Sequence, residues 1–202
     1  MAVIRAQQTA IPAEASAAKA ALRISHDTGM SVRLPAPFLV DRISPNACLV
    51  SDVFCHEGRR KHHLEQILVE LQVNSNSYTD RRFVDVPCIS VERAPWSGVL
   101  LIKVSGVVNE AQWEGLSARV NFIRGKTEDE LNRHMLRILN QDIPKELAPS
   151  CSCSKGAGVG MLIVAMMARG GITAELGESI EHGLNRFSLD IGFMMETQGP
   201  KL

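Results

Sequence analysis

Two short motifs carry residues of the types that handle phosphate and magnesium. The first is Ser154-Lys-Gly-Ala-Gly-Val-Gly160, in which glycines occupy the alternate positions Gly156, Gly158 and Gly160 before an apolar segment. Glycines let a backbone approach a ligand closely and turn its N–H groups outward, and the N-terminal end of a helix attracts anions. The motif predicts either a phosphate-binding turn or a glycine-rich turn that only lets a helix pack closely.

The second motif is Glu70 and Asn74, four residues apart in Val69-Glu-Leu-Gln-Val-Asn74. On a helix, this spacing places both side chains on one face, about one turn apart. Carboxylate and amide oxygens in this register suit a hydrated Mg²⁺ ion, which takes a few protein oxygens together with phosphate oxygens. The alternative is a polar cluster at the end of the helix, with Asn74 or Asn76 simply terminating it.

Other candidate groups are less specific. Lys155, beside the glycine motif, could pair with a phosphate or be a solvated lysine. Cys151-Ser-Cys153 and Cys55-His56 with His62-His63 lack the spacing of a zinc site, so we do not expect metal binding by cysteine or histidine. The five cysteines are an odd number without a framework spacing, which indicates free thiols in a reducing compartment.

The composition of the chain argues against several classes of partner. Lysine plus arginine and aspartate plus glutamate both number 22, so the formal net charge is zero, and aromatic residues make up 4% of the chain. We therefore expect no nucleic-acid partner, which would need a basic or base-stacking surface. The longest apolar run, 161–168, is far shorter than the roughly 20 residues of a membrane-spanning helix. Because the N-terminus also lacks a secretory pattern, we expect a cytoplasmic protein without a membrane segment.

Helices and strands in an α+β order are expected to position the two motifs. Apolar residues recur at three- and four-residue steps after Arg59, which predicts an amphipathic helix that ends near the Asn-Ser-Asn cluster at 74–76. Thr127 and Glu130 have the spacing of a capping box, and Asn109 can cap a second helix. The other expected elements are strands at 82–91, 98–104, 172–176 and 186–194 and helices at 110–120, 128–139 and 158–169. This order predicts helices stacked on one face of a sheet.

The remaining segments have less regular patterns. Residues 1–36 are rich in alanine and broken by prolines, which predicts an N-terminal arm, mobile or docking, with a short helix over 13–22. Residues 37–202 are then expected to form a single domain. The region 38–53 is mixed and predicts no definite element. Residues 141–155 have no periodicity and predict a loop of lid-like length before the glycine motif.

The order of the two motifs resembles the ATPase domain shared by histidine kinases and gyrase, the GHKL type. That domain has a helix with Glu-x-x-x-Asn, then strands, then a Gly-x-Gly-x-Gly turn that opens a second helix, then two terminal strands. A more specific resemblance is to the SiaB family of small bacterial protein kinases, which share this fold. It covers about residues 59–194 and is carried in order by Val69–Asn74, Val104-Ser-Gly106 followed by Asn109, Glu128–Leu139 and Ser154–Gly160.

The resemblance implies a two-layer α/β sandwich of the histidine-kinase-like ATPase (Bergerat) type, with a mixed sheet and helices on one face. It implies that residues 37–202 are the ATPase domain. The cofactors would be ATP and Mg²⁺, with Asn74 as the Mg²⁺ ligand and Glu70 as the catalytic base. The backbone of Gly156, Gly158 and Gly160 would cradle the phosphates, with Lys155 beside it.

The activity that the resemblance implies is phosphorylation of a serine or threonine on a small SiaC-type partner protein, in a bacterial signalling switch linked to cyclic-di-GMP synthesis. A homo-oligomer is compatible with it. The alternative is a non-catalytic anti-sigma-like or scaffold module of the same fold, and a weaker one is an ATPase without a protein acceptor. The sequence departs from the wider superfamily at Lys103-Val-Ser-Gly-Val-Val108, which lacks the adenine-binding aspartate of an Asp-x-Gly-x-Gly turn. The segment before Arg59 also lacks the family pattern.

Overall fold

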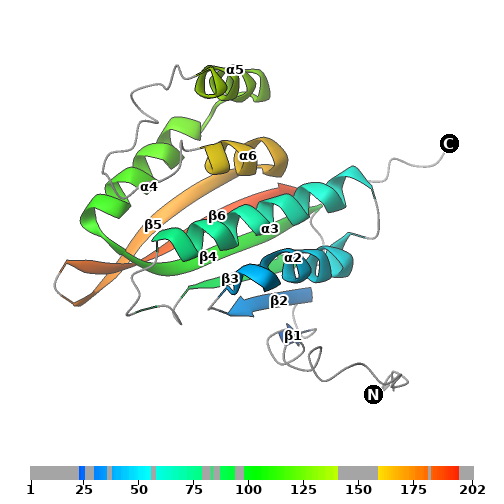
Figure 1. Cartoon of the computed structure of the whole chain (residues 1–202), viewed down its shortest axis with the longest axis horizontal. Coiled ribbons are helices and arrows are strands. Elements are labelled where there is room, and N and C mark those ends of the chain that lie inside the picture. The colour runs from blue at the N-terminus through cyan, green and yellow to red at the C-terminus, as the bar shows by residue number, and fades with distance from the viewer. Residues whose placement is uncertain are drawn as a thin grey trace.

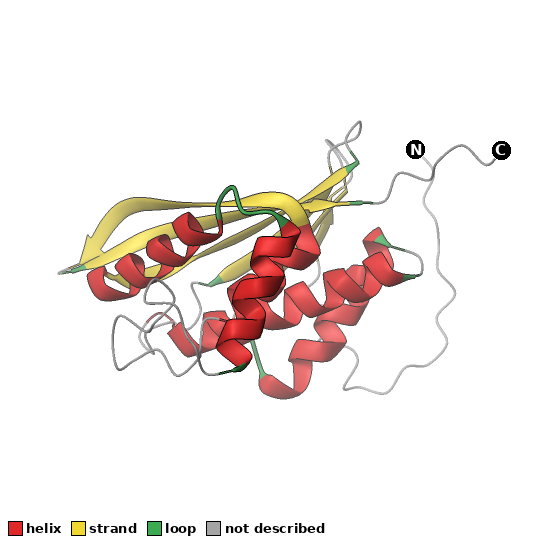
Figure 2. Ribbon diagram, turned by 90° about the horizontal axis from the view of Figure 1, so that it is seen from above, coloured by secondary structure: helices red, strands yellow, loops and turns green. Residues whose placement is uncertain are grey.

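A sheet with its helices on one face organises the computed structural model of the chain (Figure 2). The residues that the structure describes are 23–25, 30–35, 38–55, 58–78, 83, 87–93, 98–140, 159–181 and 183–195. Within these ranges the sheet has six strands in the order β1-β2-β3-β4-β6-β5. They are β1 (Arg23–Ser25), β2 (Met30–Pro35), β3 (Cys88–Arg93), β4 (Val99–Asn109), β5 (Arg169–Glu181) and β6 (Leu184–Met194).

Every pair of neighbouring strands in this sheet is antiparallel. The expected mixed sheet is therefore wrong for the described part of the chain, whereas the α+β class and the one-sided helix layer are confirmed. Three of the pairs join strands that follow one another directly, as β5 and β6 do at Gly183, and such short links favour antiparallel pairing. The pairs β2–β3 and β4–β6 are connected through helices, so long-range packing decides their direction.

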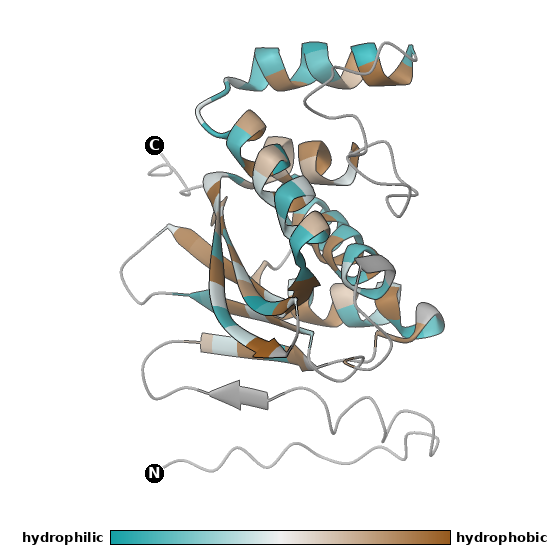
Figure 3. Ribbon diagram, turned by 90° about the vertical axis from the view of Figure 1, so that its left-hand side faces the viewer, coloured by the Kyte–Doolittle hydropathy of each residue, from teal (hydrophilic) through white to brown (hydrophobic). Residues whose placement is uncertain are grey.

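The helices of the described residues are α2 (Val40–Phe54), α3 (Arg59–Tyr78), α4 (Glu110–Ile123), α5 (Glu128–Leu139) and α6 (Val159–Ala168). α2 packs beside α3, while α4, α5 and α6 gather on the β5 side of the sheet (Figure 1). α5 packs on α6 and stands farthest from the strands (Figure 3). Among the helices described, none combines the length and the apolar character that a membrane crossing requires.

Two capping boxes determine where α4 and α5 begin, as their sequences predict. The side chain of Asn109 accepts from the N–H of Gln112 at 2.9 Å, and the Gln112 side chain accepts from the N–H of Asn109 at 2.9 Å. Thr127 Oγ1 accepts from the N–H of Glu130 at 3.3 Å, and Glu130 Oε2 accepts from the N–H of Thr127 at 2.7 Å. These bonds satisfy N–H groups that a helix start leaves unpaired, so both helices have defined first residues.

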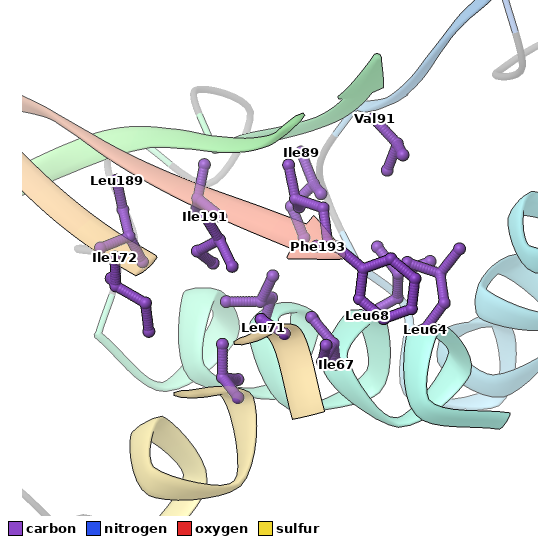
Figure 4. Close-up of a cluster of buried hydrophobic side chains, with 14 of the residues drawn as sticks. Leu64, Ile67, Leu68, Leu71, Ile89, Val91, Ile172, Leu189, Ile191 and Phe193 are labelled. Carbon is purple, nitrogen blue, oxygen red and sulfur yellow. The ribbon is translucent and has the colours of Figure 1, made fainter. Parts of the chain in front are cut away.

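The core lies between the sheet and α3 (Figure 4). The apolar residues of the predicted amphipathic helix, Leu64, Ile67, Leu68 and Leu71, are all buried, which confirms the period read from the sequence. They pack with side chains of the strands, including Ile89, Val91, Ile191 and Phe193. Burial of each such side chain contributes roughly 1.5–3 kcal/mol, so this interface holds α3 firmly on the sheet.

The structure corrects the prediction for the N-terminal third. β2 lies within the predicted arm but pairs along its whole length with β3, from Met30 opposite Arg93 to Pro35 opposite Cys88. α2 forms in a region where the sequence predicts no definite element. It contains Pro45, and proline disfavours helix interiors, which explains why its pattern does not indicate a helix. The described part of the arm therefore belongs to the sheet, whereas the helix predicted over 13–22 lies outside the described residues.

Candidate functional site

The two motifs of the sequence meet where α6 begins against α3. Gly160 is the second residue of α6, and Glu70 and Asn74 lie on one face of α3. A Cβ atom built on Gly160 would lie 2.7 Å from Glu70 Oε2 and 3.2 Å from Asn74 Nδ2. Because real Cβ atoms do not approach polar atoms that closely, both side-chain ends lie directly against the glycine backbone. The tertiary structure thus brings the carboxylate, the amide and the last glycine of the motif together.

Arg60, near the start of α3, determines how α6 lies on α3. Its Nη1 donates to the carbonyl of Met167 at 2.8 Å, and its Nη2 donates to the carbonyls of Ala168, at 3.5 Å, and of Met194. The guanidinium carbon also lies 4.1 Å from the centre of the Phe193 ring. A buried cation at the C-terminal end of a helix satisfies carbonyls that have no partner within that helix. The two helices consequently run antiparallel, and residues further along α3 face the start of α6.

Asn74 lies within α3 and not at its end. The helix continues to Tyr78, so neither Asn74 nor Asn76 is its last residue, although both lie in its C-terminal turns, as the alternative of a polar cluster there expects. Asn76 donates instead to the carbonyl of Phe38, and buried Gln72 donates to the carbonyl of Ile43 at 3.2 Å. These amides link α3 to the segment that contains α2, which leaves Asn74 as the amide turned toward α6.

Three of the predicted site residues have no described position. Lys155, Gly156 and Gly158 fall in the range 141–158, outside the described residues, as does the loop predicted at 141–155. Their predicted roles in binding phosphate therefore stay predictions. Of the three glycines of the motif, Gly160 lies among the described residues, and the partly buried side chains of Glu70 and Asn74 are its nearest polar neighbours.

The strand β4, which lacks the adenine-binding aspartate of the ATPases that the sequence resembles, is longer than predicted. β4 was expected to end at Val104 but continues to Asn109, with Ser105 opposite Ser188 and Gly106 opposite Phe187 of β6. A Cβ on Gly106 would lie 2.7 Å from Cε1 of Phe187, so this glycine makes room for an aromatic ring. The segment is a paired strand here and does not form a turn.

The histidines, cysteines and acidic residues form no metal-binding cluster in the described part of the chain. Within it, no three His, Cys, Asp or Glu side chains are placed so that they could hold a metal ion. Cys48, Cys55 and Cys88 are free thiols in that part. Glu70 and Asn74 are a different kind of candidate, because Mg²⁺ needs only one or two protein oxygens when phosphate and water supply the rest.

Comparison with known proteins finds a similar fold among solved structures. No protein-family model matches the sequence, and no curated protein matches it. Among solved structures, the chain is similar to a chain in the crystal structure of the SiaB–SiaC complex from Pseudomonas aeruginosa, so both belong to one class of α+β fold. The TM-score is 0.63 at 12% sequence identity, and the alignment covers 93% of this chain and 99% of that chain. At this identity the likeness shows the fold alone, which this chain shares with one chain of that complex.

Proposed function

We propose that this protein is an ATP-dependent serine/threonine kinase that phosphorylates a small SiaC-type partner in a bacterial signalling switch linked to cyclic-di-GMP synthesis. The observation that carries the proposal is the contact of Gly160 with Glu70 and Asn74. The similarity to a chain of the SiaB–SiaC complex supports a partner-binding signalling role. Together they favour a nucleotide site built by α3 and α6.

The residues present fit Mg-ATP. The glycine at position 160 lets a carboxylate and an amide lie directly against the backbone at the start of α6, and their oxygens are of the type that Mg²⁺ takes together with phosphate oxygens. Asn74 would hold Mg²⁺ through its amide oxygen, and the start of α6 would hold phosphate through its unpaired N–H groups. When bound, Mg²⁺ neutralises charge on the phosphate oxygens.

Glu70 would act on the acceptor hydroxyl of the partner protein. Its carboxylate lies one helical turn before Asn74, so the two groups face the same space beside Gly160. From there the carboxylate can accept the hydroxyl proton or orient the oxygen for attack. Phosphoryl transfer depends mainly on such positioning, so a small set of residues suffices.

The test uses the full chain, Mg²⁺, labelled ATP and a SiaC-type protein as acceptor. We expect Glu70→Gln and Asn74→Asp to reduce labelling by about 100-fold or more, because the first removes the proton acceptor and the second places another negative charge beside the Glu70 carboxylate and the phosphates. Glu65→Gln is the matched control on the same helix, since Glu65 faces Lys61 and His62, and it should label like the wild type. Calorimetry that detects no nucleotide binding at millimolar ATP would overturn the proposal.

A specific observation also favours a second function, a non-catalytic binding module. β4 continues as a paired strand through Ser105 and Gly106 and carries no adenine-binding aspartate. A protein of this fold that has lost nucleotide turnover would still capture its partner. Capture of a SiaC-type protein that is indifferent to ATP and to Asn74→Asp would favour this module over the kinase. Phosphate release without a protein acceptor would indicate a simple ATPase.

A further inference from the structure

A cavity of about 560 Å³ lies away from the proposed nucleotide site. Its walls come from the turn between α4 and α5, from the start of β5 and from β4 and β6. Ala165 and Arg169 place it near the C-terminal end of α6, whereas Gly160 lies at the opposite end of that helix. Glu70, Asn74 and Gly160 are not among its lining residues. The size suits a ligand of small-molecule dimensions.

The polar lining of this cavity is mainly cationic. Among the lining residues that the structure describes, Arg124 and Lys126 reach it from the α4–α5 turn and Arg169 from β5, and one residue, Asp190, is acidic. The ammonium of Lys126 lies 4.5 Å from the centre of the Phe122 ring, which holds the lysine in place. Cations from two separate segments therefore converge on one space, and an anion is the ligand that this arrangement favours.

The guanidinium of Arg169 can exchange its ionic partner within the protein, Glu128, for a ligand. Its Nη2 pairs with Glu128 Oε2 at 3.0 Å, and the two side chains are 49% and 50% exposed. An ion pair this exposed contributes little to stability, so an anion in the cavity can replace Glu128 at little cost. The capping box of Thr127 and Glu130 already satisfies the start of α5, so the side chains and not that helix end would bind the anion.

The backbone at Arg169 is strained in a way that suits a binding residue. Of the described residues, Arg169 is the one non-glycine with a positive φ, at 64°, and a bulge lies between it and Ile172. A left-handed backbone is unfavourable for a non-glycine residue, and such strain is concentrated at functional sites. Bulges of this kind redirect a side chain, here the guanidinium that lines the cavity.

Glycines leave the neighbouring surface of the cavity free of side chains. A Cβ on Gly170 would lie 2.2 Å from the carbonyl oxygen of Gly192, so the two backbones approach too closely for any larger residue. Both glycines line the cavity, together with Gly171 and Thr173. Exposed backbone and the threonine hydroxyl thus add hydrogen-bonding groups beside the cations.

We propose that this cavity binds a small phosphate ester whose organic part carries hydroxyl groups. The guanidinium forks of Arg124 and Arg169 match phosphate oxygens, and Asp190 can accept hydrogen bonds from hydroxyls. This site is independent of the proposed nucleotide site, because α6 separates Arg169 from Gly160.

The test is calorimetric titration of the full chain with ribose 5-phosphate, with ribose and inorganic phosphate as comparison probes. We expect saturable binding of ribose 5-phosphate that Arg124→Ser and Arg169→Gly each weaken about 10-fold or more. Arg169→Gly is the sharper variant, since glycine adopts the same φ without strain and the fold should be at least as stable. Arg133→Ser, an exposed arginine of α5 outside the cavity lining, is the matched control.

Three results overturn the proposal. They are the absence of saturable binding at millimolar ribose 5-phosphate, equal weakening by Arg133→Ser, and binding of inorganic phosphate as tightly as the ester. Asn74→Asp should leave the titration unchanged, so a failure here is distinguishable from a failure of the kinase. Thermal unfolding of each variant checks that weaker binding does not come from a destabilised fold.

Discussion

Replacing Gly160 by alanine separates the structural role of this glycine from its role at the site. The new Cβ would meet the carboxylate oxygen of Glu70 at 2.7 Å and the amide nitrogen of Asn74 at 3.2 Å. Both atoms are the ends of side chains, and side-chain ends can move. We therefore expect the variant to fold and to lose phosphorylation, because both functional groups are pushed from their places.

The magnitudes of the two effects differ widely. Alanine in place of glycine favours a helix by up to about 1 kcal/mol, while forcing the Glu70 side chain off its preferred rotamer costs about 0.5–1.5 kcal/mol. The free energy of unfolding should change by less than about 1 kcal/mol. A displacement of about 1 Å at a reacting group costs roughly 100-fold in rate, so labelling of the partner should fall by that factor.

The assay combines urea unfolding with ATP-dependent labelling of a SiaC-type protein. Gly177→Ala is the matched control, because a Cβ at Gly177 would lie 3.4 Å from Cβ of Arg186, an ordinary contact. The control should keep both stability and labelling. Wild-type labelling by Gly160→Ala would refute the reasoning about the site, and a loss of more than about 3 kcal/mol of stability would refute the reasoning about the contact.

Two further predictions concern the start of α3. Arg60→Met removes the donors to the carbonyls at the ends of α6 and β6, so we expect a loss of about 3 kcal/mol in urea unfolding; a loss under about 1 kcal/mol would contradict the anchoring role. Burial, together with the neighbouring charge of Arg60, holds the pKa of His63 below its ordinary value of 6.5. A histidine with a lowered folded-state pKa contributes stability above that ordinary value, and the contribution is lost as the pH falls below it. Unfolding curves between about pH 7.5 and pH 5.5 should therefore lose less stability on acidification in His63→Asn than in the wild type, and identical pH dependence would contradict this assignment.

Features with a short-range cause could be predicted from the sequence. α5 spans Glu128–Leu139 as expected, because the side chains of Thr127 and Glu130 bond each other's backbone three residues apart. The apolar period of α3 likewise appears as a buried face. By contrast, α2 was not predicted, because it contains Pro45, a residue that disfavours helix interiors. The strand β2 was not predicted either, although Val32 and Leu34 alternate with polar residues and are buried.

At the candidate site too, some features could be predicted from the sequence and others could not. The residue types and spacings of Glu70, Asn74 and Gly160 could be read from the sequence alone, since they depend on helical geometry and on the missing glycine side chain.

Only the tertiary structure decided that these residues touch. Arg60 and the core place α6 antiparallel on α3, and contacts between residues so far apart in the chain leave no local pattern. The antiparallel order of the sheet and the cationic cavity at Arg169 have the same origin, because both depend on long-range pairing and a backbone bulge rather than on neighbouring residues.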